Sequence, residues 1–320
     1  MLSGLSLPEV AVLLLAGVLL DLLLGEPRRW HPLVGFGALA GRIEACLNRH
    51  DQHDQHDRRF ARGLLAWSVV VLPPSVLAWL AAQYAGLWLH ALLLYACIGL
   101  RSLYDHTMPI VEALRAGDLA TARTRTSWIV SRDTHDAQEP ELAKAGAESL
   151  LENGNDAVFG TLFWFAVAGG PGAVLFRLAN TLDAMWGYRN ARFNLFGRAA
   201  ARIDDVLNFL PARLTALSYV VLAGAASDRA WRCWRTQAPG WSSPNAGPVM
   251  ASGAGALGVS LGGAAVYDGK LEQRPPLGEG PPASSEDIVR AWRLVLGTTL
   301  LWLGVAGAVA LFAVLRGQHA

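Results

Sequence analysis

Four long apolar runs constrain what this chain can fold into more than any other feature. They cover residues 8–24, 64–82, 86–104 and 294–315. Each has roughly the 17–22 residues that a helix needs to cross a hydrocarbon core of about 30 Å. Because a helix satisfies its own backbone hydrogen bonds inside lipid, the sequence predicts an all-α, polytopic integral membrane protein with about four full transmembrane helices.

Two further apolar stretches are predicted to enter the membrane without crossing it. Residues 157–177 are interrupted by a Gly-Gly-Pro-Gly sequence at 169–172, and residues 212–227 are short and rich in small side chains. A full crossing by 157–177 would place the Arg-rich segment 178–211 outside, against the positive-inside rule. We therefore expect re-entrant or interfacial helices at both stretches, large polar loops on the cytoplasmic side, and both termini in the periplasm.

The chain is predicted to form a single integral membrane domain, residues 1–320, in which three polar segments carry the site. These segments are residues 21–44, 128–213 and 243–270. The first contains Asp21, and a carboxylate inside an apolar run is costly in lipid and typical of a functional position. The second sets Asp, Glu, Arg and Asn between apolar residues at helical spacing, a density that a solvated loop does not need.

One face of the helix predicted before residue 157 is acidic. Glu148, Glu152 and Asp156 recur at four-residue steps and so lie on one side of a helix. Like charges at this spacing repel mildly, so they belong on a solvated face or around a cation. Asp156 directly precedes an apolar run, which favours a cation, and Mg²⁺ takes one or two carboxylates together with phosphate oxygens and waters. A solvated helix face is the alternative.

A cluster of arginines follows in residues 183–213. Guanidinium groups bind phosphate or carboxylate through paired hydrogen bonds. Asp204 and Asp205 supply either metal ligands or internal ion pairs to these arginines, and the pattern leaves both interpretations open. The two lysines of the chain, Lys144 and Lys270, lie outside any GxxxxGK sequence, so the chain has no P-loop.

Two glycine-rich or proline-rich segments come later in the chain. The segment 243–270 is rich in small residues, which indicates close approach of its backbone to another helix or to a ligand. The proline-rich stretch 274–285 is predicted to be the least ordered part of the chain.

The earlier repeat HDQHDQHD, residues 50–57, has the composition of a solvated loop rather than of a metal site.

Charge and cysteine content exclude several classes of partner. A net charge of +1 without a basic patch provides no surface for nucleic acid. Cys46, Cys97 and Cys233 are scattered and odd in number, which does not suit a disulfide framework or a thiolate metal site. The expected partners are therefore small molecules and the lipid bilayer.

Several motifs, in order along nearly the whole chain, resemble one family. They are LDLLLGEPRRWHP near the start, SRDT and ENGNDAVFG in the middle, NTLDAMWGYRN followed by ARIDDVLNFLPARL, and SPNAG with LGVSLGG and YDGK near the end. This combination is similar to the CobD/CbiB family of cobalamin biosynthesis, the adenosylcobinamide-phosphate synthases. Agreement among independent motifs makes the resemblance more specific than any one of them.

The resemblance implies a multi-pass enzyme of the inner membrane, and we expect its active site on the cytoplasmic face. Its family reaction joins a carboxylate of adenosylcobyric acid to (R)-1-aminopropan-2-ol or its O-phosphate, with ATP consumption. The product is adenosylcobinamide or its phosphate, so the corrinoid is a substrate rather than a cofactor. Mg²⁺ is the expected metal, and a homo-oligomer or other enzymes of the corrinoid pathway are the further expected partners.

Candidate roles follow from matching this chemistry to the polar residues. The amine proton is expected to pass to Asp133 or His135, and Glu152 and Asp156 complete the predicted catalytic set. The expected metal ligands are Glu152, Asp156, Asp204 and Asp205. The expected substrate and phosphate contacts are Arg132, Asp183, Arg189, Asn190, Arg192, Asn245 and Gly247.

Two other classes of function stay open. A related branch of membrane proteins resembles this family and is linked to β-lactamase regulation, which would make the chain a non-enzymatic sensing protein. The intact SPNAG and ARIDDVLNFLPAR motifs favour the enzyme. Asp21 and the broken apolar stretch also suit a transporter, whereas four full spans without an internal repeat argue against one.

The topology can be tested at Arg198. If every Arg-rich segment is cytoplasmic, a cysteine placed there in a background without the three native cysteines resists an impermeant maleimide in intact cells and reacts after lysis. Ready labelling in intact cells would show that the stretch 157–177 crosses the membrane once.

Overall fold

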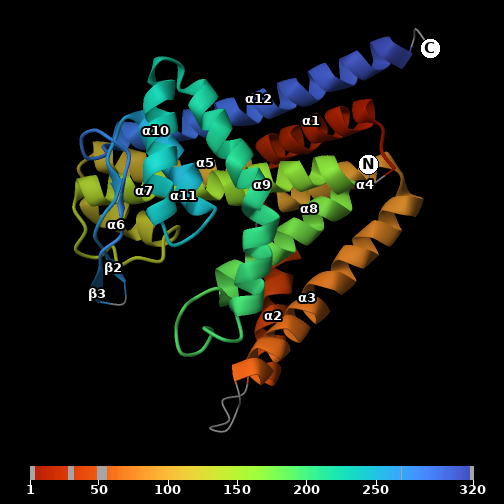
Figure 1. Ribbon diagram of the computed structural model, residues 1–320, viewed down its shortest axis with the longest axis horizontal. Helices are drawn as coiled ribbons and strands as arrows, with labels where there is room; N and C mark the ends of the chain where they lie inside the picture. Colours follow the sequence, from red (N-terminus) through yellow and green to blue (C-terminus); the bar gives the residue numbers. More distant parts are fainter. Residues whose placement is uncertain (1–3, 28–31, 49–55, 268, 318–320) are drawn as a thin grey trace. The chain divides into compact units, whose positions relative to one another are not determined.

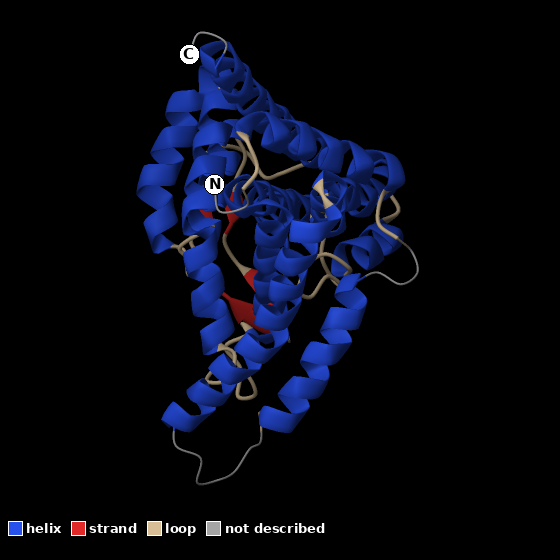
Figure 2. Cartoon of the chain, turned by 90° about the vertical axis from the view of Figure 1, so that its right-hand side faces the viewer, coloured by secondary structure: helices blue, strands red, loops and turns tan. Residues whose placement is uncertain are grey.

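Helices predominate among the described residues of the computed structural model, which are 4–27, 32–48, 56–267 and 269–317 (Figure 2). The predicted all-α class is confirmed. Residues 28–31 and most of the repeat at 50–57 lie outside the described residues, so nothing tests the expected loop there.

The elements follow one another in this order: α1 (Leu7–Leu24), α2 (Pro32–Leu47), α3 (His56–Ala85), α4 (Leu87–Cys97), α5 (Leu100–Arg115), α6 (Leu119–Ser127), α7 (Glu139–Asn153), the π-helix η1 (Gly154–Phe159), α8 (Gly160–Trp186), α9 (Arg198–Leu222), the 3₁₀ turn η2 (Gly224–Ala226), α10 (Ser227–Gln237), the 3₁₀ turn η3 (Ala238–Gly240), α11 (Ala246–Leu257), the short strands β1 (Leu261–Gly262), β2 (Ala265–Tyr267), β3 (Lys270–Glu272) and β4 (Pro276–Leu277), and α12 (Ser285–Gly317). The strands form two antiparallel pairs, β1 with β4 and β2 with β3.

Six helical runs among the described residues are long and apolar enough to cross a membrane, by length and composition. Four of them correspond to the four predicted spans: Leu7–Leu24, Arg58–Ala85, Leu87–Arg115 and Ser285–Gly317. The other two, Glu139–Trp186 and Arg198–Leu222, overlap the stretches 157–177 and 212–227 that we expected to be re-entrant or interfacial. The chain is thus a polytopic membrane protein, with two more candidate helices than the four apolar runs predicted.

The outer surface of these runs is apolar. Val12 on α1 is 66% exposed, Leu77 on α3 is 65% exposed and Leu311 on α12 is 60% exposed. A soluble protein rarely exposes apolar side chains in such number over whole helices, because water penalises large apolar patches. These faces are therefore suited to contact with lipid.

Contacts between Cα atoms divide the chain into two compact units. The first unit contains Met1–Gly99, Gly160–Asn208 and Val305–Ala320. The second contains Leu100–Phe159 and Phe209–Gly304. Neither unit is one continuous piece of chain, so each requires segments far apart in the sequence to pair.

Local sequence signals set the limits of the first helix. Ser6 and Glu9 form a capping box at the start of α1, in which the Ser6 amide donates to Glu9 over 2.7 Å. Gly25 ends the helix with a φ of 64°, a conformation that glycine adopts without strain. The hydroxyl of Tyr95 on α4 donates to the Gly25 carbonyl over 2.8 Å and holds this end in place. Asp21, one turn earlier, is 1% exposed.

The core of the first unit lies where α2, α3 and α8 meet, side by side in Figure 1. Its buried residues are Phe36, Ala40, Ala66, Trp67, Val70, Val71, Leu178, Ala179, Leu182, Trp186, Phe196 and Ala200. Phe196, in the loop before α9, packs edge-on against Trp186 with ring centroids 5.2 Å apart. The large aromatic groups therefore anchor the polar loop 187–197 to the helices.

α8 consists of two arms that fold back on each other. Helical angles are lost at Ala168 and Gly169, where the glycine has a φ of 65°. A Cβ added to Gly160 would lie 2.1 Å from the ring of Phe176. In a straight helix these two residues would be about 24 Å apart, so the second arm returns along the first. The break predicted at the Gly-Gly-Pro-Gly sequence is confirmed.

Close backbone contact and a buried histidine hold this hairpin. A Cβ at Gly172 would lie 2.2 Å from the Trp164 carbonyl oxygen, so the arms approach too closely for any larger residue. The ring of His90 on α4 is buried, and its Nδ1 accepts a hydrogen bond from the Gly170 amide over 3.0 Å. This bond satisfies a donor at the start of the second arm that has no helical partner.

Small residues bring the helices of the second unit together. Figure 1 shows α10 and α11 side by side. A Cβ on Gly255 would lie 2.7 Å from the Cα of Ala230, and one on Gly253 would lie 2.6 Å from the side chain of Leu151 on α7. At these two glycines, the small residues of the segment 243–270 therefore serve helix packing, one of the two interpretations that the sequence allowed.

The prediction that 274–285 is the least ordered part of the chain is wrong. Leu277 on β4 pairs with Leu261 on β1. Arg232 donates to Glu279 over 3.1 and 2.7 Å, and these hydrogen bonds hold the pKa of the Glu279 carboxyl below its usual range. Proline lacks an amide donor yet is compatible with the edge of a two-stranded pair, so composition alone misleads here.

Gly172→Ala tests the α8 hairpin. The added methyl group overlaps the Trp164 carbonyl, so we expect a loss of about 1–3 kcal/mol in the free energy of unfolding, measured as a lower melting temperature in detergent. Gly41→Ala on α2 is the matched control, because a Cβ there meets no atom within 4 Å. Equal melting of the two variants would contradict the close contact.

Candidate functional site

α7 carries the polar face that the sequence predicts. The helix begins at a capping box in which the Gln138 amide donates to Glu141 over 2.8 Å. Lys144, Glu148 and Glu152 follow at three- and four-residue steps, on the same side as Glu141. α7 packs against α5, α6 and α11, and burial rises along this face: Glu141 is exposed, whereas Glu148 is 2% exposed.

The buried carboxylate of Glu148 holds three separate segments of the second unit. Arg132, in the loop before α7, forms an ion pair with it. Arg274, after β3, donates to both of its oxygens over 3.4 and 3.3 Å. The amide of Gly262 on β1 donates to it over 2.7 Å. A buried charge is tolerated only when it is paired and hydrogen-bonded, and Glu148 meets both conditions.

Glu152 and Asp156 continue the acidic face beyond this network. Glu152 lies close enough to interact electrostatically with Asp156, Glu148, Arg132 and Arg274. The predicted ligand Asp156 and the predicted phosphate-binding Arg132 thus both lie within electrostatic reach of Glu152. The described residues contain no group of three or more His, Cys, Asp or Glu that could enclose a metal ion. Two carboxylates suit Mg²⁺ that arrives with phosphate oxygens and waters.

Asp156 lies within η1, a π-helical turn. Asn155, 2% exposed, donates to the Asp156 carboxylate over 3.0 Å and accepts from the Thr215 hydroxyl over 3.0 Å. The hydroxyl of Tyr219 donates to the Leu151 carbonyl over 3.4 Å just before the turn. π turns are rare and occur frequently at functional sites. Here the turn orients Asp156 through its bond with Asn155.

The loop before α7 and the β2–β3 hairpin pair with each other. The Asp133 amide donates to the Val266 carbonyl over 2.8 Å, and the Asp133 carboxylate accepts from the Gly269 amide over 2.8 Å. The ammonium group of Lys144 donates to the carbonyls of Gly262 and Ala264 over 3.0 and 3.3 Å. Asp133, a predicted catalytic residue, thus also holds Gly269 of the hairpin.

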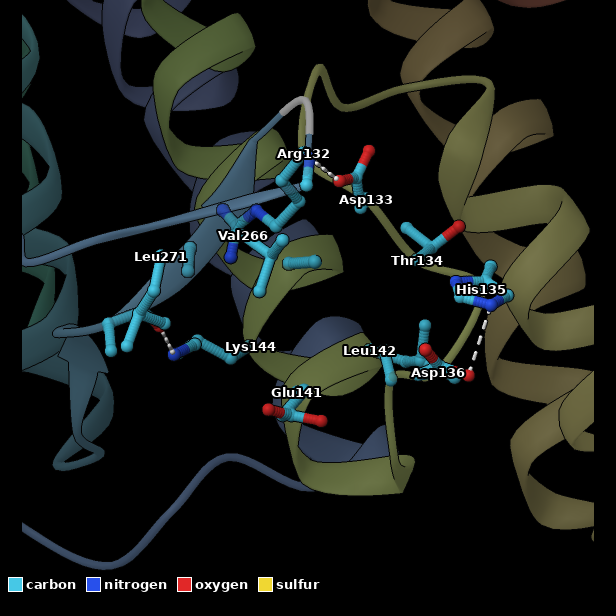
Figure 3. Close-up of a pocket in the computed structure, with 15 residues that line it drawn as sticks. Arg132, Asp133, Thr134, His135, Asp136, Glu141, Leu142, Lys144, Val266 and Leu271 are labelled. Atoms are coloured by element: carbon cyan, nitrogen blue, oxygen red, sulfur yellow. Dashed lines mark hydrogen bonds and ion pairs between the residues drawn. The ribbon is translucent and has the colours of Figure 1, made fainter.

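A cavity of about 390 Å³ lies between these two segments and α7 (Figure 3). Figure 3 shows Lys144 and Glu141 entering from α7, Val266 and Leu271 from the hairpin, and Asp133 to Asp136 from the loop. His135 lies at the exposed rim, where its Nε2 is 3.2 Å from the Asp136 carboxylate. A volume of this size lies within the range of pockets that bind small molecules.

Asn245 and Gly247 lie beside a second cavity in the same unit. Asn245 is 5% exposed and accepts a hydrogen bond of 2.6 Å from Arg213. A Cβ on Gly247 would lie 2.7 Å from the Ala238 carbonyl oxygen, so packing against η3 requires glycine. Arg213, Arg235, Trp234 and Trp241 are among the residues that line a cavity of about 560 Å³ next to this turn.

The remaining predicted phosphate contacts lie in the first unit, in and just before the loop 187–197. Arg192 donates to both oxygens of the buried Glu44 over 3.1 and 2.6 Å, and these bonds raise the pKa of the Arg192 guanidinium. Asn190 caps a turn by accepting from the Phe193 amide over 3.0 Å. Arg189 is exposed. Asp183 lies at the end of α8, and its carboxylate is beside the backbone of Gly187.

Asp204 and Asp205 are on α9, also in the first unit. Asp204 is 7% exposed and accepts hydrogen bonds from the side chains of Asn180 and Asn208 over 3.3 and 3.1 Å. Among the predicted metal ligands, Glu152 and Asp156 belong to one compact unit and Asp204 and Asp205 to the other.

Sequence reasoning missed Lys144 and Arg274 as parts of the site. Lys144 was recognisable because it is one of two lysines and lies on the same helical face as Glu148. Arg274 stands in the proline-rich stretch that composition marks as disordered, and no local signal links it to Glu148, which lies 126 residues earlier.

The comparisons with known proteins point to one family. The family model described as CobD/Cbib protein matches residues 14–295. The cobalamin biosynthesis protein CobD of Chromobacterium violaceum is 55% identical over 304 residues, 94% of this chain and 97% of that protein. The protein of the same name from Stutzerimonas stutzeri is 54% identical over 92% of this chain and 96% of its own length. The cobalamin biosynthesis protein CbiB of Salmonella arizonae is 34% identical over 93% and 94% of the two chains. No solved structure matches the chain.

Glu148→Gln tests whether one carboxylate organises the site. The change keeps the shape but leaves Arg132 and Arg274 without a buried counter-charge, so we expect a loss of roughly 3–5 kcal/mol in the free energy of unfolding. Chemical denaturation in detergent measures it. Glu272→Gln on the exposed strand β3 is the control and should leave stability nearly unchanged. Wild-type stability of Glu148→Gln would mean that the ion pairs add nothing to the fold.

Proposed function

We propose a ligase function in cobalamin biosynthesis from one premise: the chain belongs to the CobD/CbiB family. The relatives are named for cobalamin biosynthesis, and they align with nearly the whole of this chain. The observation that carries the proposal is that Glu152 lies within electrostatic reach of Asp156 and of Arg132, and that Arg132 also lines a cavity for a small molecule. A guanidinium group, and carboxylates that would hold Mg²⁺, are suited to stabilising charge on a transferring phosphoryl group.

The proposed reaction forms an amide between adenosylcobyric acid and aminopropanol or its phosphate. A carboxylate oxygen is a poor leaving group, so ATP first transfers its γ-phosphoryl group to that oxygen and leaves as ADP. The amine nitrogen then attacks the carbonyl carbon, the bond to the phosphorylated oxygen breaks, and inorganic phosphate departs. The amine gives up a proton to a base. One amide bond forms and one ATP is hydrolysed to ADP and phosphate.

Residues of the second unit are suited to these steps. Arg132, held by Glu148, presents its guanidinium group beside the cavity and would bind the transferred phosphoryl group. Glu152 and Asp156 would hold Mg²⁺ together with the nucleotide. When bound, Mg²⁺ neutralises charge on the phosphate oxygens. Asp133 and His135 line the cavity and are the candidates for accepting the amine proton.

Residues of the first unit would take part in recognising phosphate or corrinoid groups. Arg189 is exposed and Arg192 keeps 63% of its side chain exposed while it is anchored by Glu44. Asp183 and Asn190 flank them in the sequence. Asn245 and Gly247 in the second unit would serve the same purpose beside the larger cavity. The enzyme would work in the inner membrane with its polar segments on the cytoplasmic side, where ATP is available.

A reconstitution assay tests the function directly. Purified protein in detergent is incubated with adenosylcobyric acid, ATP, Mg²⁺ and either aminopropanol or its phosphate. Mass analysis should show a corrinoid whose mass has risen by that of the amine less one water, with ADP formed in equal amount. Consumption of neither ATP nor corrinoid with either amine would refute the proposal.

Asp156→Asn should remove most of the activity and leave a folded protein, because it keeps the size of the side chain and removes a charge expected to bind metal. The Mg²⁺ concentration for half-maximal rate should rise in whatever activity remains. Asp228→Asn on α10 is an acidic-to-amide control away from the proposed cluster. If Asp156→Asn turns over like the parent at every Mg²⁺ concentration, the metal is held elsewhere, with Asp204 and Asp205 next to be tested.

A further inference from the structure

We propose that the cavity beside α10 binds the phosphate of an anionic phospholipid, whose acyl chains lie along the exposed apolar face of α9. The inference goes beyond the proposed function and does not depend on it. Asn245 and Gly247, which we assign to substrate recognition, are not among the residues that line this cavity. The assignment to lipid comes from the charge of the cavity, from its tryptophans and from the apolar helix face on which one of its arginines stands.

The charge of the cavity is positive. Arg213 from α9 and Arg235 from α10 line it, and none of the described lining residues is Asp or Glu. Arg235 is exposed, lies over the ring of Trp231 and forms no ion pair with any residue that the structure describes. Its guanidinium group therefore keeps its donors for a ligand, and phosphate is an anion that such a group binds through paired hydrogen bonds.

Arg213 is fixed at the wall of the cavity by contacts on two sides. Its Nη1 donates to the side chain of Asn245 over 2.6 Å and to the Phe209 carbonyl over 3.1 Å. The guanidinium carbon also lies 3.7 Å from the centroid of the Phe209 ring. Because the group is already held in place, a ligand that binds to it need not pay for ordering a long side chain.

Arg213 stands within an apolar stripe of α9. Phe209, Leu217 and Val221 follow it or precede it at multiples of four residues, so they lie on the same face of the helix, and all three are exposed. α9 is long and apolar enough to cross a membrane. A cation on a face that contacts lipid is tolerated where it reaches phosphate groups or water. The stripe and the arginine together fit an amphiphile with an anionic head.

α10 has the composition of a helix at a membrane surface. Residues 223–226 alone separate its start at Ser227 from the end of α9 at Leu222. Trp231 is exposed and packs edge-on against Trp234, with ring centroids 5.1 Å apart. Tryptophan gathers at the level of lipid headgroups, and arginines at that level attract anionic lipids. Trp234 also lines the cavity, so the cavity is placed where a headgroup would lie.

A phospholipid explains more of these features than a soluble phosphate does. A soluble phosphate would use the two arginines and leave the exposed stripe of α9 uncovered, whereas a phospholipid uses both. The volume of about 560 Å³ is sufficient for a headgroup with its glycerol. The two arginines would also repel the cationic choline of a zwitterionic lipid, so the site should select lipids with a net negative charge.

Native mass spectrometry of the full-length protein in detergent tests the proposal. The probes are phosphatidylglycerol, phosphatidylcholine with the same acyl chains, and glycerol phosphate, which has no acyl chains. We expect phosphatidylglycerol to bind roughly tenfold more tightly than phosphatidylcholine, because two arginines contact its phosphate. Equal affinity for the two lipids would overturn the role of the arginines. Displacement of phosphatidylglycerol by an equal concentration of glycerol phosphate or ATP would identify a site for soluble phosphate and overturn the assignment to lipid.

Variants of Arg235 test the charge of the site. Arg235→Gln should remove most of the preference for phosphatidylglycerol and leave the affinity for phosphatidylcholine unchanged, whereas Arg235→Lys keeps the charge and should keep most of the preference. Arg293→Gln is the matched control, because Arg293 is exposed on α12 directly before its apolar run and lines neither cavity. An unchanged preference in Arg235→Gln, or an equal loss in the control, would overturn a specific site at α10.

Leu217→Ser tests the place of the acyl chains. The change removes an apolar side chain from the exposed stripe, so the affinity for both lipids should fall by roughly threefold while the preference between them stays the same. Unchanged affinity for both lipids would show that the acyl chains do not lie on α9. These measurements report lipid binding alone, so their outcome does not depend on whether the protein forms an amide.

Discussion

The carboxylate of Glu148 is the group on which the second unit depends. Its partner Arg132 comes from the loop just before α7. Its partners Gly262 and Arg274 come from two segments that are not adjacent to α7 in sequence. A buried carboxylate cannot remain unpaired, so these segments must assemble around it. The cavity beside α7 is a result of that assembly, because its walls are the loop and the hairpin that Glu148 holds. The same carboxylate therefore connects the stability of the unit to the shape of the cavity.

Glycine provides the second constraint, through how closely helices approach. In the second unit Gly253 and Gly255 let α11 lie directly on α7 and α10, and in the first unit Gly160 and Gly172 let the two arms of α8 touch. Inside lipid, helices gain little from burying apolar surface against each other, so close packing of this kind supplies much of the association. These glycines therefore set the close spacing of the helices that carry the polar groups.

Much of the fold was predictable because long apolar runs and helix-breaking residues act locally. The four spans, the start of α7 at Gln138 and the break in α8 at Gly169 each follow from a few neighbouring residues. The site was predictable in part: the helical spacing of Glu148, Glu152 and Asp156 places them on one face, and the structure brings Arg132 to that face. Arg274 was not predictable, since its partner is set by tertiary pairing of β-strands of two or three residues that carry almost no periodic signal.

The hairpin in α8 also limits how the chain can be threaded through a bilayer. The residues that enter the first arm and those that leave the second lie side by side, as the contact between Gly160 and Phe176 shows. Such an element contributes two crossings or none, whatever depth its tip reaches, and never one. Whether the other helices that cross the membrane are even or odd in number therefore decides whether the two termini lie on the same side or on opposite sides. A change in the depth of the hairpin would not alter this relation between the termini.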